Sequence, residues 1–117
     1  MKAKRAVGAL SALAQETRLA VFRMLVREAP DGVTAGVIAE RLRVPPATLS
    51  FHLAQLEHAR LARARRRSRN IFYTANVEGI RELLAFLTED CCQGRPEFCG
   101  VALPPRQRAR VLYTKER

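Results

Sequence analysis

The segment from residue 33 to residue 58 places the strongest constraint on the fold of this chain. Two stretches with apolar residues at helical spacing, 33–42 and 46–58, are separated only by Arg43-Val44-Pro45. Pro46 suits the first turn of the second helix, because the amide proton that proline lacks has no helical partner there. Two short helices joined by so few residues predict a helix-turn-helix.

The second of these helices has two different faces. Leu49, Leu53 and Leu56 form an apolar face that we expect to point into the core. We assign to the outer face Ala47, Thr48, Ser50, Phe51, His52 and Gln55. Hydroxyl groups can donate to phosphates, imidazole and amide groups can reach base edges, and a phenyl ring can contact a thymine methyl group. For Phe51, partial packing under the following hairpin is an equal alternative, and for His52 the alternative is a solvated surface histidine.

An arginine-rich stretch follows the two helices. Six of the ten residues from 60 to 69 are arginine, and the β-prone run Ile71-Phe72-Tyr73-Thr74 comes next. We predict a hairpin over residues 61–75 with its tip at 67–69. A helix-turn-helix with such a hairpin is a winged helix, and we expect its arginines to lie along phosphates or in a narrow minor groove. These are Arg65, Arg66, Arg67 and Arg69. The alternative is a merely solvated charged face.

The charge balance and the remaining periodicity agree with this fold class. Lys and Arg number 21 against 11 Asp and Glu, a net charge of +10 that favours a polyanionic partner such as nucleic acid. Helical spacing over residues 6–28, broken near 15–17, and again over 77–89 predicts three more helices. We therefore expect a mainly α fold with a small β-hairpin: a winged helix-turn-helix over 1–90, then a cysteine segment and basic tail over 91–117.

Three segments carry a resemblance to a known family. The run Ala12-Leu13-Ala14-Gln15-Glu16-Thr17-Arg18-Leu19 resembles the opening helix of ArsR/SmtB metal-responsive repressors. The segment from Val44 to Leu56 is similar to their recognition helix, and the segment from Arg67 to Tyr73 to their wing. The resemblance implies a homodimer that binds a two-fold symmetric operator in double-stranded DNA and releases it when a metal or metalloid binds.

The only cysteines of the chain, Cys91, Cys92 and Cys99, lie within nine residues of one another. Thiolates are soft ligands, and trivalent arsenic or antimony binds three of them in a pyramid. Other inducer sites of the resembled family lack their ligands here, since 34–38 has no thiol and 77–89 has no histidine. The cluster resembles the arsenic-responsive branch, which implies arsenic(III) or antimony(III) as inducer.

Other uses of the cysteines remain open. Zinc or cadmium would recruit a fourth ligand such as His52 or His58, two thiols could form a redox-switched disulfide, or the thiols could be inert. A protein of another class, one that binds nucleic acid constitutively and holds a structural metal, is the main competing hypothesis. An enzyme is not expected, because no nucleophile–base set and no glycine-rich phosphate loop is present.

The helices at the two ends of the winged domain carry more apolar surface than a small core needs. We therefore expect the homodimer to form through the N-terminal helix and the 77–89 helix. No apolar run approaches the roughly 20 residues of a membrane span, and the N-terminus lacks the hydrophobic region of a signal peptide. We expect a cytoplasmic protein without a membrane partner and without a catalytic cofactor.

Overall fold

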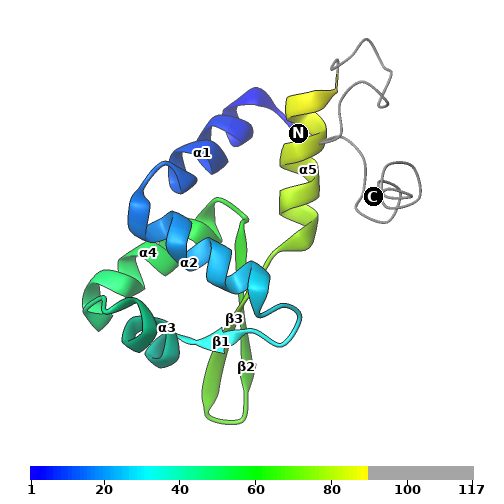
Figure 1. Ribbon diagram of the computed structural model, residues 1–117. Coiled ribbons are helices and arrows are strands. Elements are labelled where there is room, and N and C mark those ends of the chain that lie inside the picture. The colour runs from blue at the N-terminus through cyan, green and yellow to red at the C-terminus, as the bar shows by residue number, and fades with distance from the viewer. Residues whose placement is uncertain (90–117) are drawn as a thin grey trace, which may run out of the picture.

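A computed structural model describes residues 1–89, which form five helices and one small sheet (Figure 1). In chain order the elements are α1 (Ala3–Leu13), α2 (Glu16–Arg27), β1 (Val33–Thr34), α3 (Ala35–Leu42), α4 (Pro46–His58), β2 (Ala62–Arg67), β3 (Asn70–Ala75) and α5 (Val77–Thr88). The predicted winged helix-turn-helix is confirmed. Helices α3 and α4 lie on one side, the β2–β3 hairpin projects past them, and α1 and α5 lie at the opposite end (Figure 1).

The N-terminal helical stretch is interrupted where the sequence predicted a break. Ala14 and Gln15 lie between α1 and α2, and Gln15 has extended backbone angles. Its side-chain oxygen accepts a hydrogen bond from the backbone N–H of Arg18 at 2.8 Å. Because the first amide groups of a helix have no partner inside it, this contact stabilises the start of α2.

The sheet has three antiparallel strands in the order β1-β3-β2. In the hairpin, Ala62 pairs with Ala75 and Arg67 pairs with Asn70, so the tip falls where it was predicted. The expectation that a helix begins at residue 33 is wrong by two residues, because Val33 pairs with Tyr73 as part of β1. Thr34 then caps α3, its hydroxyl accepting from the N–H of Val37 at 3.3 Å.

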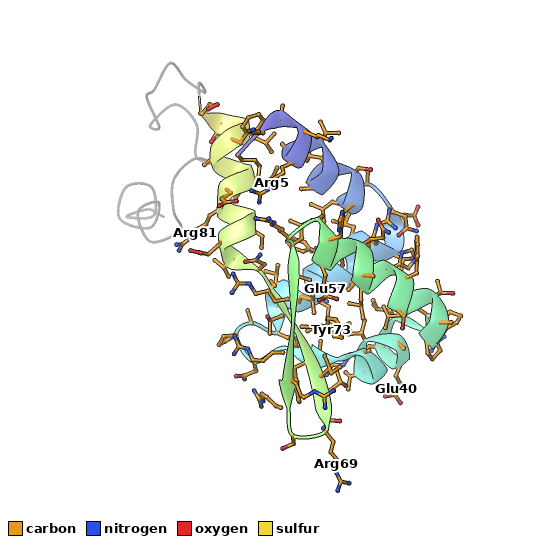
Figure 2. All side chains as sticks on the ribbon, turned by 180° about the vertical axis from the view of Figure 1, so that it is seen from behind. Arg5, Glu40, Glu57, Arg69, Tyr73 and Arg81 are labelled. Carbon is orange, nitrogen blue, oxygen red and sulfur yellow. The ribbon has the colours of Figure 1, made fainter. Side chains whose placement is uncertain are left out.

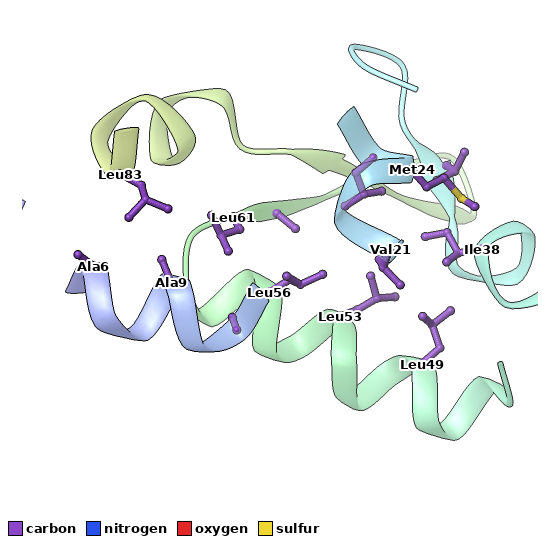
Figure 3. Close-up of a cluster of buried hydrophobic side chains, with 14 residues drawn as sticks. Ala6, Ala9, Val21, Met24, Ile38, Leu49, Leu53, Leu56, Leu61 and Leu83 are labelled. Carbon is purple, nitrogen blue, oxygen red and sulfur yellow. The ribbon is translucent and has the colours of Figure 1, made fainter. Parts of the chain in front are cut away.

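The core lies between α2, α3, α4 and the base of the hairpin (Figure 3). Its largest fully buried side chains are Val21, Leu25, Ile38, Leu49, Leu53, Leu56 and Leu61. Helix α1 contributes small residues instead, with Ala6, Ala9 and Ala12 facing inward. Because alanine is small, α1 can approach α4 and α5 closely. The larger Val7 and Leu10 lie on the exposed side of α1.

Asn76 and Gly79, at the start of α5, contact the chain just after the end of α4. The Asn76 side chain donates to the Arg60 carbonyl at 3.0 Å and accepts from the Gly79 N–H at 3.3 Å. Arg60 itself adopts a left-handed backbone conformation, φ 63°, just after α4. This joint sets the position of α5 relative to α4 and the hairpin.

Candidate nucleic-acid interface

The face of α4 opposite its buried leucines is uncovered and carries hydroxyl, amide and phenyl side chains. Leu49, Leu53 and Leu56 are buried, as predicted, and anchor the helix. Exposed on the other side are Ala47, Thr48, Ser50, Phe51 and Gln55. The Phe51 side chain is 58% exposed, so the alternative in which it packs under the hairpin does not apply.

The expected outer-face position of His52 is wrong. His52 is only 8% exposed and lies on the same side of α4 as the leucines. Its Nδ1 atom lies 3.1 Å from Nη1 of Arg18, which reaches it from α2. The neighbouring Phe51 ring meets the imidazole edge-on at 5.7 Å between centroids. His52 is therefore held inside the domain and does not reach a base edge from this position.

The surroundings of His52 favour its neutral form. Burial, and secondarily the positive charge of Arg18, lower the pKa of the His52 imidazole from its ordinary value. A guanidinium group can only donate hydrogen bonds, so Nδ1 of His52 acts as the acceptor and the proton resides on Nε2. No local pattern in the sequence indicates the contact between Arg18 and His52, which are 34 positions apart.

The wing, defined as the hairpin of β2 and β3, carries its arginines on exposed positions. Arg65, Arg66, Arg67 and Arg69 are all exposed, and Arg69 projects from the hairpin tip (Figure 2). The guanidinium carbon of Arg67 lies 4.6 Å from the centroid of the Phe72 ring, a cation–π contact that was not predicted. Within residues 1–89 the ion pairs are Arg5–Glu82 and Arg41–Glu28, so no carboxylate there neutralises the wing arginines.

The polar end of α4 and the cationic wing together form a surface suited to duplex DNA. An α-helix fits the major groove, about 12 Å wide, while an arginine-rich hairpin beside it can follow the phosphates. The opposite, C-terminal end of α4 has a different environment, because His58 lines a concavity with Lys2, Arg5 and Arg60.

The predicted inducer ligands Cys91, Cys92 and Cys99 lie outside the described residues. Within residues 1–89, no three His, Cys, Asp or Glu side chains gather closely enough to hold a metal ion. In that same part of the chain, no helix is both long enough and apolar enough to cross a bilayer.

A helix-turn-helix followed by an antiparallel hairpin with exposed arginines is the fold of winged-helix DNA-binding proteins. A family model described as a helix-turn-helix domain matches residues 13–65. The transcriptional activator HlyU of Vibrio cholerae is 30% identical over 89 residues, covering 76% of this chain and 80% of HlyU. The HTH-type transcriptional regulator KmtR of Mycobacterium tuberculosis is 33% identical over 107 residues, covering 89% and 80%. This chain belongs to the ArsR/SmtB family of winged-helix transcriptional regulators.

Solved structures agree with the fold. The structure of HlyU from Vibrio cholerae superposes with a TM-score of 0.61 at 29% identity, covering 80% of this chain and all of that one. A fragment of Mb0332 from Mycobacterium bovis, described as a homodimeric winged helix-turn-helix DNA-binding domain, reaches a TM-score of 0.61 at 19% identity. It covers 79% of this chain and 85% of the fragment, and at that identity it supports the fold alone.

Proposed function

We propose that this regulator is a repressor that binds a two-fold symmetric operator and releases it when trivalent arsenic or antimony binds. The DNA-binding half of the proposal is carried by one observation: the outer face of α4 and the wing arginines are both exposed, and those arginines have no carboxylate partner within residues 1–89. In this proposal Thr48 and Ser50 donate to phosphates, Gln55 reaches a base edge and Phe51 contacts a thymine methyl group. The wing arginines Arg65, Arg66, Arg67 and Arg69 lie along the backbone or enter the minor groove.

The dimer is proposed to form through α1 and α5. Val7 and Leu10 on α1, and Leu84 and Leu87 on α5, are all exposed apolar side chains. An ion pair of 3.0 Å between Arg5 and Glu82 joins the two helices at the protein surface, and their exposed sides can act as one surface. A two-fold axis through that surface would place two copies of α4 on successive turns of DNA, about 34 Å apart.

The inducer site is proposed to be Cys91, Cys92 and Cys99. On binding arsenite, each thiol gives its proton to one hydroxide of the arsenic centre, which leaves as water while a sulfur–arsenic bond forms. Oxidation states do not change, and three thiolates satisfy a trivalent centre. The segment follows directly on α5, one of the two helices proposed to form the dimer. Coupling of about 1–3 kcal/mol between inducer and operator would weaken DNA binding by roughly 5–150-fold.

Replacement of one thiol tests the inducer site. We expect Cys92→Ser to bind the operator as tightly as the unaltered protein and to be insensitive to arsenite, because an alcohol is a poor ligand for arsenic(III). The measurement is a gel shift on a duplex selected from a random library, with arsenite titrated against fully reduced protein. Weakened DNA binding in the arsenite-free variant, or normal release by arsenite, would contradict the proposal.

A thiol redox switch is the second candidate, because one related solved structure is described as reduced HlyU from Vibrio cholerae. It is 32% identical and superposes with a TM-score of 0.57 over 77% of this chain and 92% of that one. The same gel shift distinguishes the two mechanisms. Release by the thiol oxidant diamide, but not by arsenite under reducing conditions, would replace the arsenic proposal with the redox one. Release by zinc alone would favour a divalent-metal sensor.

A further inference from the structure

Arg18 joins three helices through a single guanidinium group. Its Nε donates to the carbonyl oxygen of Ala12, in the last turn of α1, at 2.7 Å. Its Nη1 donates to Nδ1 of His52, in α4, at 3.1 Å. The residue belongs to the first turn of α2, where Gln15 holds its backbone N–H. The last carbonyls of a helix lack helical partners, so the contact with Ala12 ties α1 at a point that needs a donor.

We propose that the Arg18–His52 hydrogen bond is a polar link that, together with the direct packing of α1 on α4, positions the DNA-reading helix α4, and that this link requires a neutral imidazole. The proposal rests on the proposed function in taking α1 as part of the dimer surface and α4 as the helix that enters the groove. Arg18 and His52 are positioning residues in it, since neither reaches the DNA.

The position of His52 explains how the link would act on DNA binding. His52 is buried, so a change in its contact with Arg18 cannot be absorbed by solvent. It directly follows Phe51, whose exposed ring also contacts the imidazole edge. Rotation or translation of α4 at His52 therefore moves Phe51, and with it the polar end of the helix. Because α1 carries the exposed residues Val7 and Leu10, the link connects the proposed dimer surface to the reading surface.

Protonation is the natural way to break this link. With a second proton, Nδ1 of His52 would become a donor facing the Arg18 guanidinium, so two cations would meet without an acceptor between them. Charged residues also occur on the other elements packed against α4, but Arg18 is the charge that acts on the titration of His52. The charged residues on these elements are Lys4 and Arg5 on α1, Glu40 and Arg41 on α3, and Arg63, Arg65, Arg66 and Arg67 on β2, with Glu16, Arg23 and Arg27 besides Arg18 on α2.

The sign of the pH effect follows from the lowered pKa of His52. The pKa of His52 in the folded protein lies below its value of about 6.5 in the unfolded chain. The stability that depends on neutral His52 is therefore present above about pH 6.5 and is lost as the pH falls through the folded pKa. Operator binding that depends on the link should weaken in the same direction. Added protons otherwise increase the positive charge of a basic protein and favour binding to phosphates, so the two effects have opposite signs.

The test compares two replacements of His52 in the full chain. In His52→Asn the side-chain oxygen lies close to the place of Nδ1, so the acceptor is kept and titration is lost. In His52→Leu the acceptor is lost. At about pH 7.5 we expect His52→Asn to bind the selected duplex nearly as well as the unaltered protein. We expect His52→Leu to bind it at least about tenfold more weakly, because that is the effect of losing one charge-assisted hydrogen bond. On acidification to about pH 5.5, the affinity of the unaltered protein should fall relative to that of His52→Asn.

Two controls separate the link from general effects. His58→Asn removes the only other histidine, which is the last residue of α4, and should keep the pH profile of the unaltered protein. The double variant Arg18→Ala/His52→Leu should bind no more weakly than Arg18→Ala alone, because the two residues act through one contact. Melting curves at each pH confirm that every variant is folded where its binding is measured.

The possible outcomes are distinct. Equal affinity of His52→Leu and the unaltered protein would overturn the link, as would a parallel pH profile for His52→Asn. Additive losses in the double variant would also overturn it. If the unaltered protein itself selects no specific duplex, the proposed function fails first, and that failure is seen before any variant is compared.

Discussion

At the residue scale, contacts with particular atoms decide roles that residue type alone leaves open. His52 is polar, yet with Leu49, Leu53 and Leu56 it completes the i, i+3, i+4, i+7 spacing of a buried helical face. The spacing of these four residues thus predicts a buried His52, whereas its polar imidazole favours an exposed position, and the spacing is the correct guide here. What spacing could not supply is the partner: Arg18 is 34 positions away in sequence and becomes a neighbour only after folding.

Gly79 is a second residue whose role depends on one contact. A Cβ atom added there would overlap the carbonyl oxygen of Arg60, which Asn76 holds in place. Glycine to alanine in a helix normally stabilises by about 0.5–1 kcal/mol. At this position we expect Gly79→Ala to destabilise the protein instead, by roughly 1–3 kcal/mol, because backbone must move to make room.

Urea unfolding at one fixed protein concentration measures this effect. Gly36→Ala is the matched control, because Gly36 is also helical and a Cβ there meets nothing within 4 Å. Its free energy of unfolding should stay the same or rise. A stabilised Gly79→Ala variant would show that the backbone at Arg60 can move aside at little cost in free energy.

At the element scale, the wing combines a cationic surface with an internal support. Strand pairing places Arg65 opposite Phe72 and Arg67 opposite Asn70. Arg67 nevertheless leans over the Phe72 ring, which orders a long side chain before DNA arrives. A preordered arginine loses less conformational freedom on binding than a solvated one.

We expect Arg67→Ala to weaken operator binding and to flatten its salt dependence. Each phosphate contact releases counterions, so the slope of log affinity against log salt should fall in magnitude by about 1. Gel shifts over a salt series measure this slope. Arg81→Ala is the control, since Arg81 is exposed on α5, far from the wing tip at Arg69 (Figure 2), and should leave the slope unchanged. An unchanged slope in Arg67→Ala would remove this residue from the contact set.

At the scale of the whole molecule, a single protomer offers one reading helix and one wing. The proposed two-fold symmetric operator needs two of each, so under that proposal affinity depends on the dimer as much as on the contacts. Helices α1 and α5, which carry the exposed apolar residues of the proposed interface, lie at the end of the molecule away from the wing tip (Figure 1). That arrangement leaves both reading surfaces free when the opposite ends pair.

We expect Leu84→Glu to produce a folded monomer that binds the operator at least about tenfold more weakly, because a carboxylate in an apolar interface lacks a partner. Light scattering coupled to size exclusion measures the mass, and a gel shift measures the affinity. Val26→Glu on α2 is the matched control, since Val26 is 48% exposed against 45% for Leu84. It should remain dimeric. A dimeric Leu84→Glu variant would place the interface elsewhere.

The sequence by itself determined the order and type of the main elements, the wing with its arginines and the outward position of most candidate DNA-binding residues. These features follow from local periods, turn residues and charge, which are properties of neighbouring positions. It also predicts the three-cysteine inducer site, whose ligands lie at 91–99, beyond the described residues. Tertiary structure alone decided the pairing of Val33 with Tyr73, the small alanine face of α1, the Arg67–Phe72 contact and the burial of His52 against Arg18. Each depends on which distant segments come together, and no local pattern specifies that.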